Sequence, residues 1–452
     1  MNIREVVLDI LLELSSQNEY SNILISRALE KYNDLDGKEK AFIKRVSEGT
    51  LERRIQIDFV LEQFSTVPVK KMKPLIRELM RMSCYQILFM ENIPDAAVCN
   101  EAVKLAKKRK FQSLQGYVNG VLRAIVRGKE KIIYPDRQTA YHDYLSVCYS
   151  MPLWLVEHFC NAYGDERCEL ILQSFLQPGA VSVRFQETLD DKERERLIKV
   201  WQQEGVEVCK STYLPYAVEI EKSDGIRNLA GYGEGAFAVQ DVSSMLVVEA
   251  VGIKAGDTII DVCAAPGGKA LHAAAKLAGT GQVIACDVTP YKADKIEENR
   301  DRLHMTNVSI KVRDARITDE ELVGQADVLL ADVPCSGLGV IGKKQDIKYR
   351  VTPESLQQVI ALQKEIVGNV VQYLKPDGIM MYSTCTMNPA ENEKMVRWIC
   401  DKYDMEQVSM APYMPEALKE EADKGYIQLL PGVHKTDGFF LAKLRKKQTV
   451  MQ

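Results

Sequence analysis

The chain has 452 residues, 46% of them hydrophobic and 27% charged, a composition typical of globular proteins with two or three domains. No apolar run reaches the roughly 18 residues of a membrane span, and the first residues lack the apolar stretch of a signal peptide, so we expect neither a membrane span nor export. The 11 cysteines include no Cys-x-x-Cys pair, which disfavours a disulfide framework or zinc site and favours a reducing cytoplasm, with no metal bound.

Residues 1–132 are predicted to form a helical domain, because apolar residues recur at helical spacing from Val6 to Leu14 and from Ile76 to Tyr85. Residues 1–131 hold 23 Lys and Arg against 17 Asp and Glu, whereas the whole chain has a formal net charge of −4. A basic run, Lys107-Lys108-Arg109-Lys110, lies on a predicted helix. This uneven charge favours contact with a phosphate backbone. A solvated helix face explains the same charge equally well.

Residues 133–235 are predicted to form a linker followed by a small α/β domain. Pro135 and Pro152 interrupt the first part, and residues 178–185 alternate in hydrophobicity like a strand. From residue 236 the pattern becomes βαβ, which predicts a doubly wound, mostly parallel, Rossmann-like α/β sheet over 236–452. The predicted strands are Thr258–Val262, Val283–Cys286, Val308–Val312, Val328–Ala331 and Ile379–Tyr382.

A nucleoside site is predicted where the first of these strands ends. The turn Cys263-Ala264-Ala265-Pro266-Gly267-Gly268-Lys269 separates the strand from a helix, and its glycines permit close approach to a ligand. Asp287 ends the next strand, at the position that often binds ribose hydroxyls, and Asp314 follows the third, where it could meet an adenine amino group. The turn has neither Gly-x-Gly-x-x-Gly nor Lys-Ser/Thr, which disfavours NAD and ATP and favours S-adenosylmethionine. Each aspartate alone is more often a turn or helix cap, so the prediction rests on the three strand ends together.

Asp332, Cys335 and Cys385 are the candidate catalytic residues. Each cysteine follows a predicted buried strand, so both are expected at the carboxyl edge of the sheet, where ligands bind. Methylation of cytosine carbon 5 requires a thiolate that adds to carbon 6, a carboxyl group beside the ring, and a group that assists elimination. These three side chains supply all three types. Taken singly, either cysteine is better explained as a buried structural thiol, and it is the position of both after strands that end at the same crevice that favours catalysis.

At these positions the chain resembles the Nol1/Nop2/Sun family of RNA cytosine-5 methyltransferases. The resemblance includes the turn from Cys263 to Lys269, Asp-x-Pro-Cys-Ser-Gly at Asp332, and Ser-Thr-Cys ending at Cys385. It extends to Gln240-Asp241-x-x-Ser244 and to the segment from His434 to Phe440. The resemblance implies that Cys385 is the nucleophile, that Cys335 assists product release and that Asp332 contacts the cytosine. It also implies a cofactor site formed by Cys263, Ala264, Ala265, Pro266, Gly267, Gly268, Lys269, Asp287, Asp314 and Asp332.

The first domain resembles the NusB-type RNA-binding domain through Tyr85–Phe89, Ile93-Pro94, Asn100–Val103 and Val118–Arg123. This combination of domains is similar to that of bacterial family members that methylate one cytosine of 16S ribosomal RNA. The resemblance implies a target of the cytosine-967 type. It also implies an RRM-like RNA-contact role for the small domain, and a cytoplasmic monomer. The RNA partner would be free 16S rRNA or an early small-subunit particle. One alternative is a tRNA cytosine-5 methyltransferase. A second is a non-catalytic ribosome assembly factor, which the three intact site residues disfavour. A third is a small-molecule methyltransferase, which the basic domain disfavours.

Two pairs of residues depart from the family pattern. Phe185-Gln186 stands where the family usually has Asn-Thr, and Lys344-Gln345 precedes Asp346 where His-Pro or a similar pair is common. Both are expected to lie near RNA or in the loop that receives the target base.

Overall fold

The structure of the chain is a computed structural model, which describes residues 2–16, 20–32, 35–177, 179–223 and 225–447. It divides into two compact units, one of Met1–Leu176 with Ile341–Arg350, the other of Gln177–Val340 with Val351–Gln452. The sequence predicts three domains, with boundaries at 132 and 235. Because residues 133–176 pack with the first unit and 177–235 with the second, a separate domain over 133–235 stays a prediction.

The first unit is helical. Its helices are α1 (Ile3–Ser16), α2 (Ser21–Lys31), α3 (Gly37–Glu52), α4 (Arg54–Phe64), α5 (Pro74–Phe89), α6 (Asp95–Lys108), α7 (Gln115–Gly128), α8 (Tyr141–Cys148), α9 (Leu153–Tyr163), α10 (Asp165–Ser174) and α15 (Ile347–Arg350). Helix α5 is central: Pro74 occupies its first turn, where no N–H partner is needed, and most of its residues are buried. The residues predicted as core in α1 and α5 are buried together in one apolar cluster, which confirms the helical domain.

The segment around α15 belongs to this helical unit although it follows Cys335 in the chain. The Ser21 hydroxyl donates to Asp346 Oδ1 over 2.9 Å, and the Lys348 ammonium donates to the Glu52 carbonyl over 2.8 Å. Burial lowers the pKa of Lys348 to about 7. The departure at Lys344-Gln345 therefore lies in a segment held by polar contacts with the helical unit.

The second unit begins with a small antiparallel sheet in the order β2-β3-β1-β4. Its elements are β1 (Val181–Phe185), α11 (Asp191–Gln203), β2 (Glu207–Lys210), β3 (Ala217–Lys222) and β4 (Phe237–Val239). Phe185 stacks on Trp201 with ring centroids 5.5 Å apart, and Phe237 packs edge-on against both. Phe185, the first departure from the family pattern, is thus part of an apolar core. Pro178, included in the predicted strand, lies outside the described residues.

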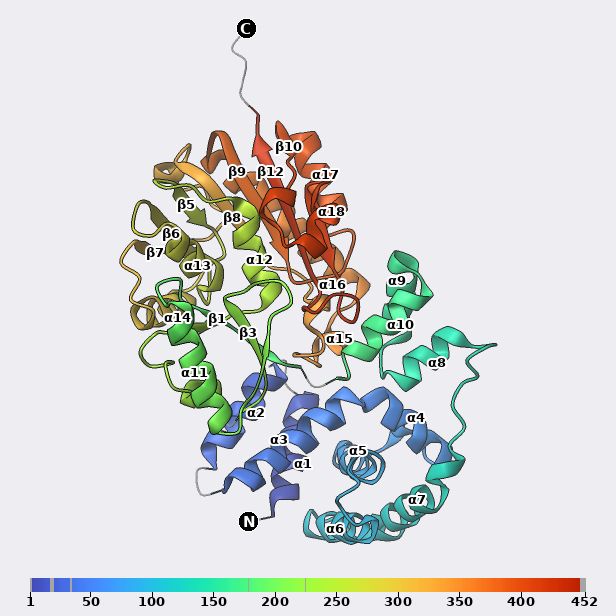
Figure 1. Cartoon of the computed structure of the whole chain (residues 1–452). Helices are drawn as coiled ribbons and strands as arrows, with labels where there is room; N and C mark the ends of the chain where they lie inside the picture. Colours follow the sequence, from blue (N-terminus) through green and yellow to red (C-terminus); the bar gives the residue numbers. More distant parts are fainter. Residues whose placement is uncertain (1, 17–19, 33–34, 178, 224, 448–452) are drawn as a thin grey trace. The chain divides into compact units, whose positions relative to one another are not determined.

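The larger sheet has the order β10-β12-β9-β8-β5-β6-β7 (Figure 1), and β11 pairs with β12. Strands β5 to β9 are parallel, and β10, β11 and β12 are antiparallel to their neighbours. The elements are α12 (Val242–Val251), β5 (Thr258–Asp261), α13 (Gly268–Lys276), β6 (Gln282–Asp287), α14 (Pro290–Arg302), β7 (Val308–Val312), β8 (Ala326–Asp332), α16 (Pro353–Val370), β9 (Leu374–Thr384), α17 (Glu393–Lys402), β10 (Met405–Gln407), α18 (Lys419–Ala422), β11 (Tyr426–Leu429) and β12 (Phe439–Lys446).

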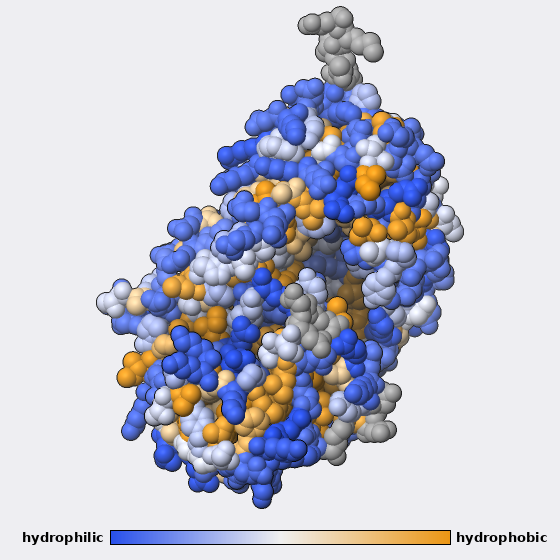
Figure 2. All heavy atoms as spheres, turned by 180° about the vertical axis from the view of Figure 1, so that it is seen from behind, coloured by the Kyte–Doolittle hydropathy of each residue, from blue (hydrophilic) through white to orange (hydrophobic). Residues whose placement is uncertain are grey.

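Helices cover both faces of this sheet, as expected for a doubly wound fold. Alternate residues of β8 show why: Val328 and Leu330 pack in the apolar cluster that includes α12 and α13, while Leu329 packs with α16 and α17. The predicted Rossmann-like fold is confirmed. Among the described residues, no helix is both long and apolar enough to span a bilayer. The face drawn in Figure 2 is mostly hydrophilic, with hydrophobic residues in scattered groups.

Candidate active site

The order of the parallel strands determines where a ligand can bind. The chain runs outward from β5 to β6 and β7, then returns to form β8 on the other side of β5. A parallel sheet opens a crevice at such a reversal, beyond the carboxyl ends of the strands. Asp261 ends β5 and Asp332 ends β8, so both carboxyl groups lie at this edge of the sheet.

The turn after β5 is held by the aspartate that ends β6. Asp287 Oδ2 accepts from the Ala265 amide over 3.0 Å, Oδ1 accepts from the Val288 amide over 2.8 Å, and Lys292 lies 3.0 Å from the carboxylate. Gly267 has a φ of +106° and precedes α13, a left-handed backbone that favours glycine. The predicted cofactor turn and Asp287 are therefore in direct contact.

The sequence predicts no role for Asp261. Its buried carboxyl group lies at the carboxyl end of β5, at the edge of the sheet where ligands bind. Oδ1 accepts from the Cys263 amide over 3.3 Å, and Oδ2 has no partner among the described residues. Burial, reinforced by the Asp332 carboxylate, raises the pKa of Asp261 to about 7. Burial and the same carboxylates raise the pKa of Cys263 well above its ordinary value. Cys263 is therefore a neutral thiol at neutral pH.

Asp314 lies two residues beyond the end of β7, next to the strand that carries Asp287, since the Arg313 amide donates to the Asp287 carbonyl over 2.9 Å. The Arg316 guanidinium donates to Asp314 over 2.6 to 3.1 Å and lowers the pKa of that carboxyl. The ends of β5, β6 and β7 thus present a series of carboxyl groups. That series suits a ligand that offers hydroxyl and amino donors, as the nucleoside of S-adenosylmethionine does.

Asp332 is held from two sides. Lys269 Nζ lies 2.8 Å from Oδ2, and the Ser383 hydroxyl donates to Oδ1 over 2.7 Å. Lys269 also lies over the Phe439 ring, 5.1 Å from its centroid. The lysine of the predicted cofactor turn therefore pairs with the candidate catalytic carboxylate, and the closing His434–Phe440 segment contacts the same lysine.

Cys335 and Cys385 face each other directly. Their Sγ atoms are 3.2 Å apart, and neither cysteine forms a disulfide. Strands β8 and β9 pair in parallel register with Asp332 opposite Ser383, so each strand delivers its cysteine two or three residues beyond that pair. The hydrogen bond to Cys385, followed by burial, raises the pKa of Cys335 well above its ordinary value. Cys335 is therefore a protonated thiol at neutral pH, in contact with the Cys385 sulfur.

Glu391, a residue without any signal in the sequence, fixes the loop that carries Cys335. Its side chain is fully buried and accepts from the amide of Ser336 over 2.9 Å and from its hydroxyl over 2.5 Å. Gln363 and Asn388 each donate to the same carboxylate over 3.0 Å. Four donors on one buried carboxylate hold Ser336, and with it the neighbouring thiol, in one position.

The same loop is joined to Cys385 through a glycine. The Gly339 amide donates to the Cys385 carbonyl over 3.0 Å, and the Gly339 carbonyl accepts from the Gly438 amide over 2.9 Å. A Cβ at Gly339 would overlap the carbonyl of Gly438, so only glycine permits this close approach. The glycine after the second predicted motif and the glycine of the closing segment thus support the thiol pair.

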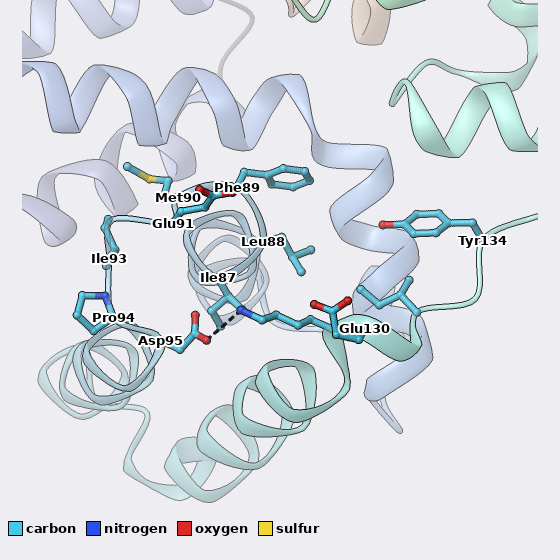
Figure 3. Close-up of a pocket in the computed structure, with 12 residues that line it drawn as sticks. Ile87, Leu88, Phe89, Met90, Glu91, Ile93, Pro94, Asp95, Glu130 and Tyr134 are labelled. Atoms are coloured by element: carbon cyan, nitrogen blue, oxygen red, sulfur yellow. Dashed lines mark hydrogen bonds and ion pairs between the residues drawn. The ribbon is translucent and has the colours of Figure 1, made fainter.

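The NusB-like motifs of the helical unit line a different cavity, of about 470 Å³ (Figure 3). Leu88, Phe89 and Pro94 belong to those motifs and contribute to its wall, and Lys129 pairs with Asp95 there over 3.3 Å. In the basic run, Lys108 lies 2.6 Å from Glu5, and Arg109 pairs with Glu5 and Asp9. Two of the four cations therefore contact acidic groups of their own unit.

The site combines a glycine turn, carboxyl groups at successive strand ends and two cysteines where the strand order reverses. In a doubly wound sheet, this combination defines an S-adenosylmethionine-dependent methyltransferase. Residues 248–445 match the family model described as 16S rRNA methyltransferase RsmB/F, and residues 1–127 match the NusB family. The chain is 35% identical over 453 residues to a probable ribosomal RNA small subunit methyltransferase B of Bacillus subtilis, covering 99% of both chains. The chain belongs to the RsmB/F family of rRNA methyltransferases, with S-adenosylmethionine as its cofactor and RNA as its substrate.

The solved structures that are similar to this chain include the following two. The crystal structure of PH0851 aligns with a TM-score of 0.79 at 25% identity and covers 98% of each chain. NSun6 from Pyrococcus horikoshii, crystallised with the S-adenosylmethionine analogue SFG, aligns with a TM-score of 0.57 at 24% identity over 65% of this chain and 98% of its own. The second likeness supports the fold.

Proposed function

We propose that the protein methylates carbon 5 of one cytosine in 16S rRNA, at a site of the cytosine-967 type, through a covalent enzyme–RNA adduct. The observation that carries the proposal is the pair of thiols 3.2 Å apart beside Asp332. A single buried thiol is a packing residue more often than a nucleophile. Two thiols in contact at the carboxyl edge of a methyltransferase sheet supply both the group that adds to the base and the group that assists its departure.

In the first step, the Cys385 sulfur bonds to cytosine carbon 6, and the electron pair of the 5,6 double bond moves toward carbon 5. A thiolate is the reactive form, and the Cys335 S–H beside it stabilises negative charge on that sulfur. Asp332 contacts the cytosine, and Lys269 and Ser383 hold its carboxylate in place for that contact. Bound S-adenosylmethionine would supply the methyl group to the carbon 5 electron pair, and its sulfonium sulfur would keep the electron pair of the broken methyl–sulfur bond.

In the second step, the carbon 5 proton passes to water, its electron pair restores the 5,6 double bond, and the carbon 6–sulfur bond breaks. The departing Cys385 sulfur takes the electron pair of the carbon 6–sulfur bond. Because Cys335 is protonated and 3.2 Å from this sulfur, it donates a hydrogen bond to the leaving thiolate. Cys335 therefore assists release of the methylated RNA, and Glu391 positions it through Ser336.

The proposed cofactor site consists of the turn after β5 and the carboxyl groups at the neighbouring strand ends. Asp287 would accept from the ribose hydroxyls and Asp314 from the adenine amino group. The turn residues Cys263, Ala264, Ala265, Pro266, Gly267 and Gly268 bring the backbone close to the ligand. Within this set, Lys269 contacts Asp332 directly, so its role is to position that carboxylate.

The proposed substrate is 16S rRNA, free or in an early small-subunit particle, and the enzyme would act as a cytoplasmic monomer. Bisulfite sequencing of ribosomal and transfer RNA from cells with and without the gene tests the reaction and the target together. We expect one protected cytosine in 16S rRNA to lose protection in the deletion strain and to regain it with the wild-type gene, but not with Cys385→Ala. Loss of protection only in tRNA would refute the ribosomal target, and no loss in either RNA would refute the activity.

A further inference from the structure

A cavity of about 700 Å³ lies within the second unit, next to the turn that opens α13. Its wall includes Arg184 of β1 and the β4 residues Ala238 and Val239. The turn contributes Pro266 and Gly268 to the same wall. The cavity therefore lies between the small sheet and the beginning of α13.

Arg184 is the notable residue of this cavity, because its charged group is buried without a counter-charge in contact. The side chain is 1% exposed. Its Nε donates to Gln240 Oε1 over 2.9 Å, while Nη1 and Nη2 have no partner among the described residues. Gln240 Nε2 is also buried without a partner among them. A buried cation with unmet donors is costly unless an anion or another acceptor reaches it.

Further cations line the same cavity. Among the residues that the structure describes, Arg227, Lys295 and Arg302 are part of its wall, against one acidic lining residue, Glu298, which pairs with Lys295 over 2.9 Å. Arg302 donates to the carbonyls of Tyr232 and Phe237, which fixes the cation in place. The cavity is therefore a positive recess whose wall includes the buried Arg184 side chain, and a guanidinium is a planar group that binds phosphate or carboxylate in a bidentate way.

We propose that this cavity binds a phosphodiester group of the substrate RNA, with the Arg184 guanidinium as its buried anchor and Arg227 and Lys295 as outer contacts. The proposal rests on the proposed function in that the ligand is the RNA to be methylated. Strand β1, which carries Arg184, and the Gln240-Asp241 motif would then both serve phosphate binding. Gln240 accepts from Nε of Arg184 and so orients the guanidinium, which leaves both Nη atoms for the phosphate.

The carboxylate of S-adenosylmethionine is the other anion that has to be considered. The groups proposed to hold the cofactor are Asp287 and Asp314, and neither is among the described lining residues of the cavity. Phosphate contacts hold the register of a nucleic acid on a protein without reading its sequence. A fixed phosphate beside the turn that precedes α13 would set the register of the RNA strand relative to the methyltransferase site.

The test is a scan of neutral phosphates. A 16S rRNA fragment that contains the target cytosine is synthesised with a single methylphosphonate at each position around that cytosine, and binding to the full-length protein is followed by fluorescence anisotropy. Because one charge-assisted bidentate contact is lost, we expect one substitution to weaken wild-type binding about tenfold or more. The same substitution should change binding to Arg184→Gln less than about twofold, since the contact is already absent.

Two further variants keep the test decisive if Arg184→Gln does not fold. Arg227→Gln with Lys295→Gln removes only outer cations and should lower the salt dependence of RNA binding by about 1.4, at roughly 0.7 per phosphate contact. Lys192→Gln with Lys199→Gln, on exposed positions of α11, is the matched control and should leave that slope unchanged. The affinity for S-adenosylmethionine, measured by calorimetry, should stay the same in every variant.

The results separate this proposal from the proposed function. If no RNA fragment binds the wild-type protein, the function is wrong. If RNA binds and is methylated but no methylphosphonate position loses its effect in Arg184→Gln, or the outer double variant behaves like the α11 control, the cavity does not bind RNA phosphate. Loss of cofactor affinity in the outer double variant would assign the cavity to the cofactor carboxylate and overturn the proposal.

Discussion

The Sγ atoms of Cys335 and Cys385 lie 3.2 Å apart although the residues are fifty positions apart in the chain. Parallel pairing of β8 with β9 explains the contact, because Asp332 and Ser383 are direct neighbours in register and each cysteine follows shortly after. The contact makes the two thiols chemically unequal, because the hydrogen bond to Cys385 and burial raise the pKa of Cys335 well above its ordinary value. This inequality supports the different roles that we propose for the two cysteines, which two substitutions can separate.

Cys385→Ala should abolish methyl transfer, with a loss of at least about 10⁴-fold in rate, since removing a nucleophile leaves only binding contributions. Transfer of labelled methyl groups to 16S rRNA is the measurement. Affinity for S-adenosylmethionine should remain near that of the wild type, because Cys385 is not in the turn that contacts Asp287. Substantial turnover by this variant would show that another group attacks the base.

Cys335→Ala should allow the first bond to form but slow its cleavage, because the leaving Cys385 thiolate loses its hydrogen-bond donor. We expect an enzyme–RNA adduct that survives denaturing electrophoresis and requires S-adenosylmethionine. The double variant Cys335→Ala with Cys385→Ala is the control and should form none. Adducts that accumulate in Cys385→Ala instead would mean that the roles of the two thiols are reversed.

The local pattern of apolar residues and turns predicts the strands well. It does not predict the buried side chains that hold the candidate catalytic residues in place. Strands β5, β6 and β7 lie within one residue of their predicted bounds because each is a short apolar run between turns. Strand β9 begins at Leu374, five residues before its predicted start, since Lys375-Pro376-Asp377-Gly378 reads as a turn. The two cysteines were found because strand ends converge in a parallel sheet. Glu391 was missed because its burial depends on Ser336 and Gln363, 55 and 28 residues away.

The charge pattern of the sequence also does not predict which cations of the basic run, Lys107 to Lys110, pair with acidic groups. Lys108 and Arg109 pair with acidic groups about a hundred residues away in the chain, and nothing near them in the sequence indicates this. Lys107 and Lys110 are exposed. The sequence therefore predicts the net charge of the helical unit, and the structure separates the cations that face acidic groups from those available to RNA.

Lys107→Gln with Lys110→Gln should weaken RNA binding and lower its salt dependence by about 1.4, at roughly 0.7 per phosphate contact. Lys108→Gln with Arg109→Gln is the matched comparison and should change the slope less, because these cations already contact Glu5 and Asp9. Binding is measured by anisotropy over a series of salt concentrations. Equal slopes for both double variants and the wild type would show that the basic run is a solvated helix face.

Asp261→Asn should change how stability depends on pH. Burial and Asp332 raise the pKa of Asp261 to about 7 in the folded protein, against about 3.9 for an exposed aspartate. The folded state therefore binds the proton more tightly than the unfolded state, so the stabilisation is complete below about pH 4 and is lost as the pH rises through 7. Asparagine keeps an acceptor for the Cys263 amide and has no proton to lose.

The measurement for this last substitution is urea denaturation of wild type and Asp261→Asn at several pH values. Between pH 5 and pH 8 the wild type should lose about 2 to 3 kcal/mol relative to the variant. Asp314→Asn is the control, because hydrogen bonds from Arg316 lower the pKa of Asp314. That carboxyl is ionised in both the folded and unfolded states over this range, so its difference from wild type should be flat. A flat difference for Asp261→Asn as well would show that the Asp261 carboxyl is ionised at neutral pH, and that its buried Oδ2 meets a donor that the described residues do not supply.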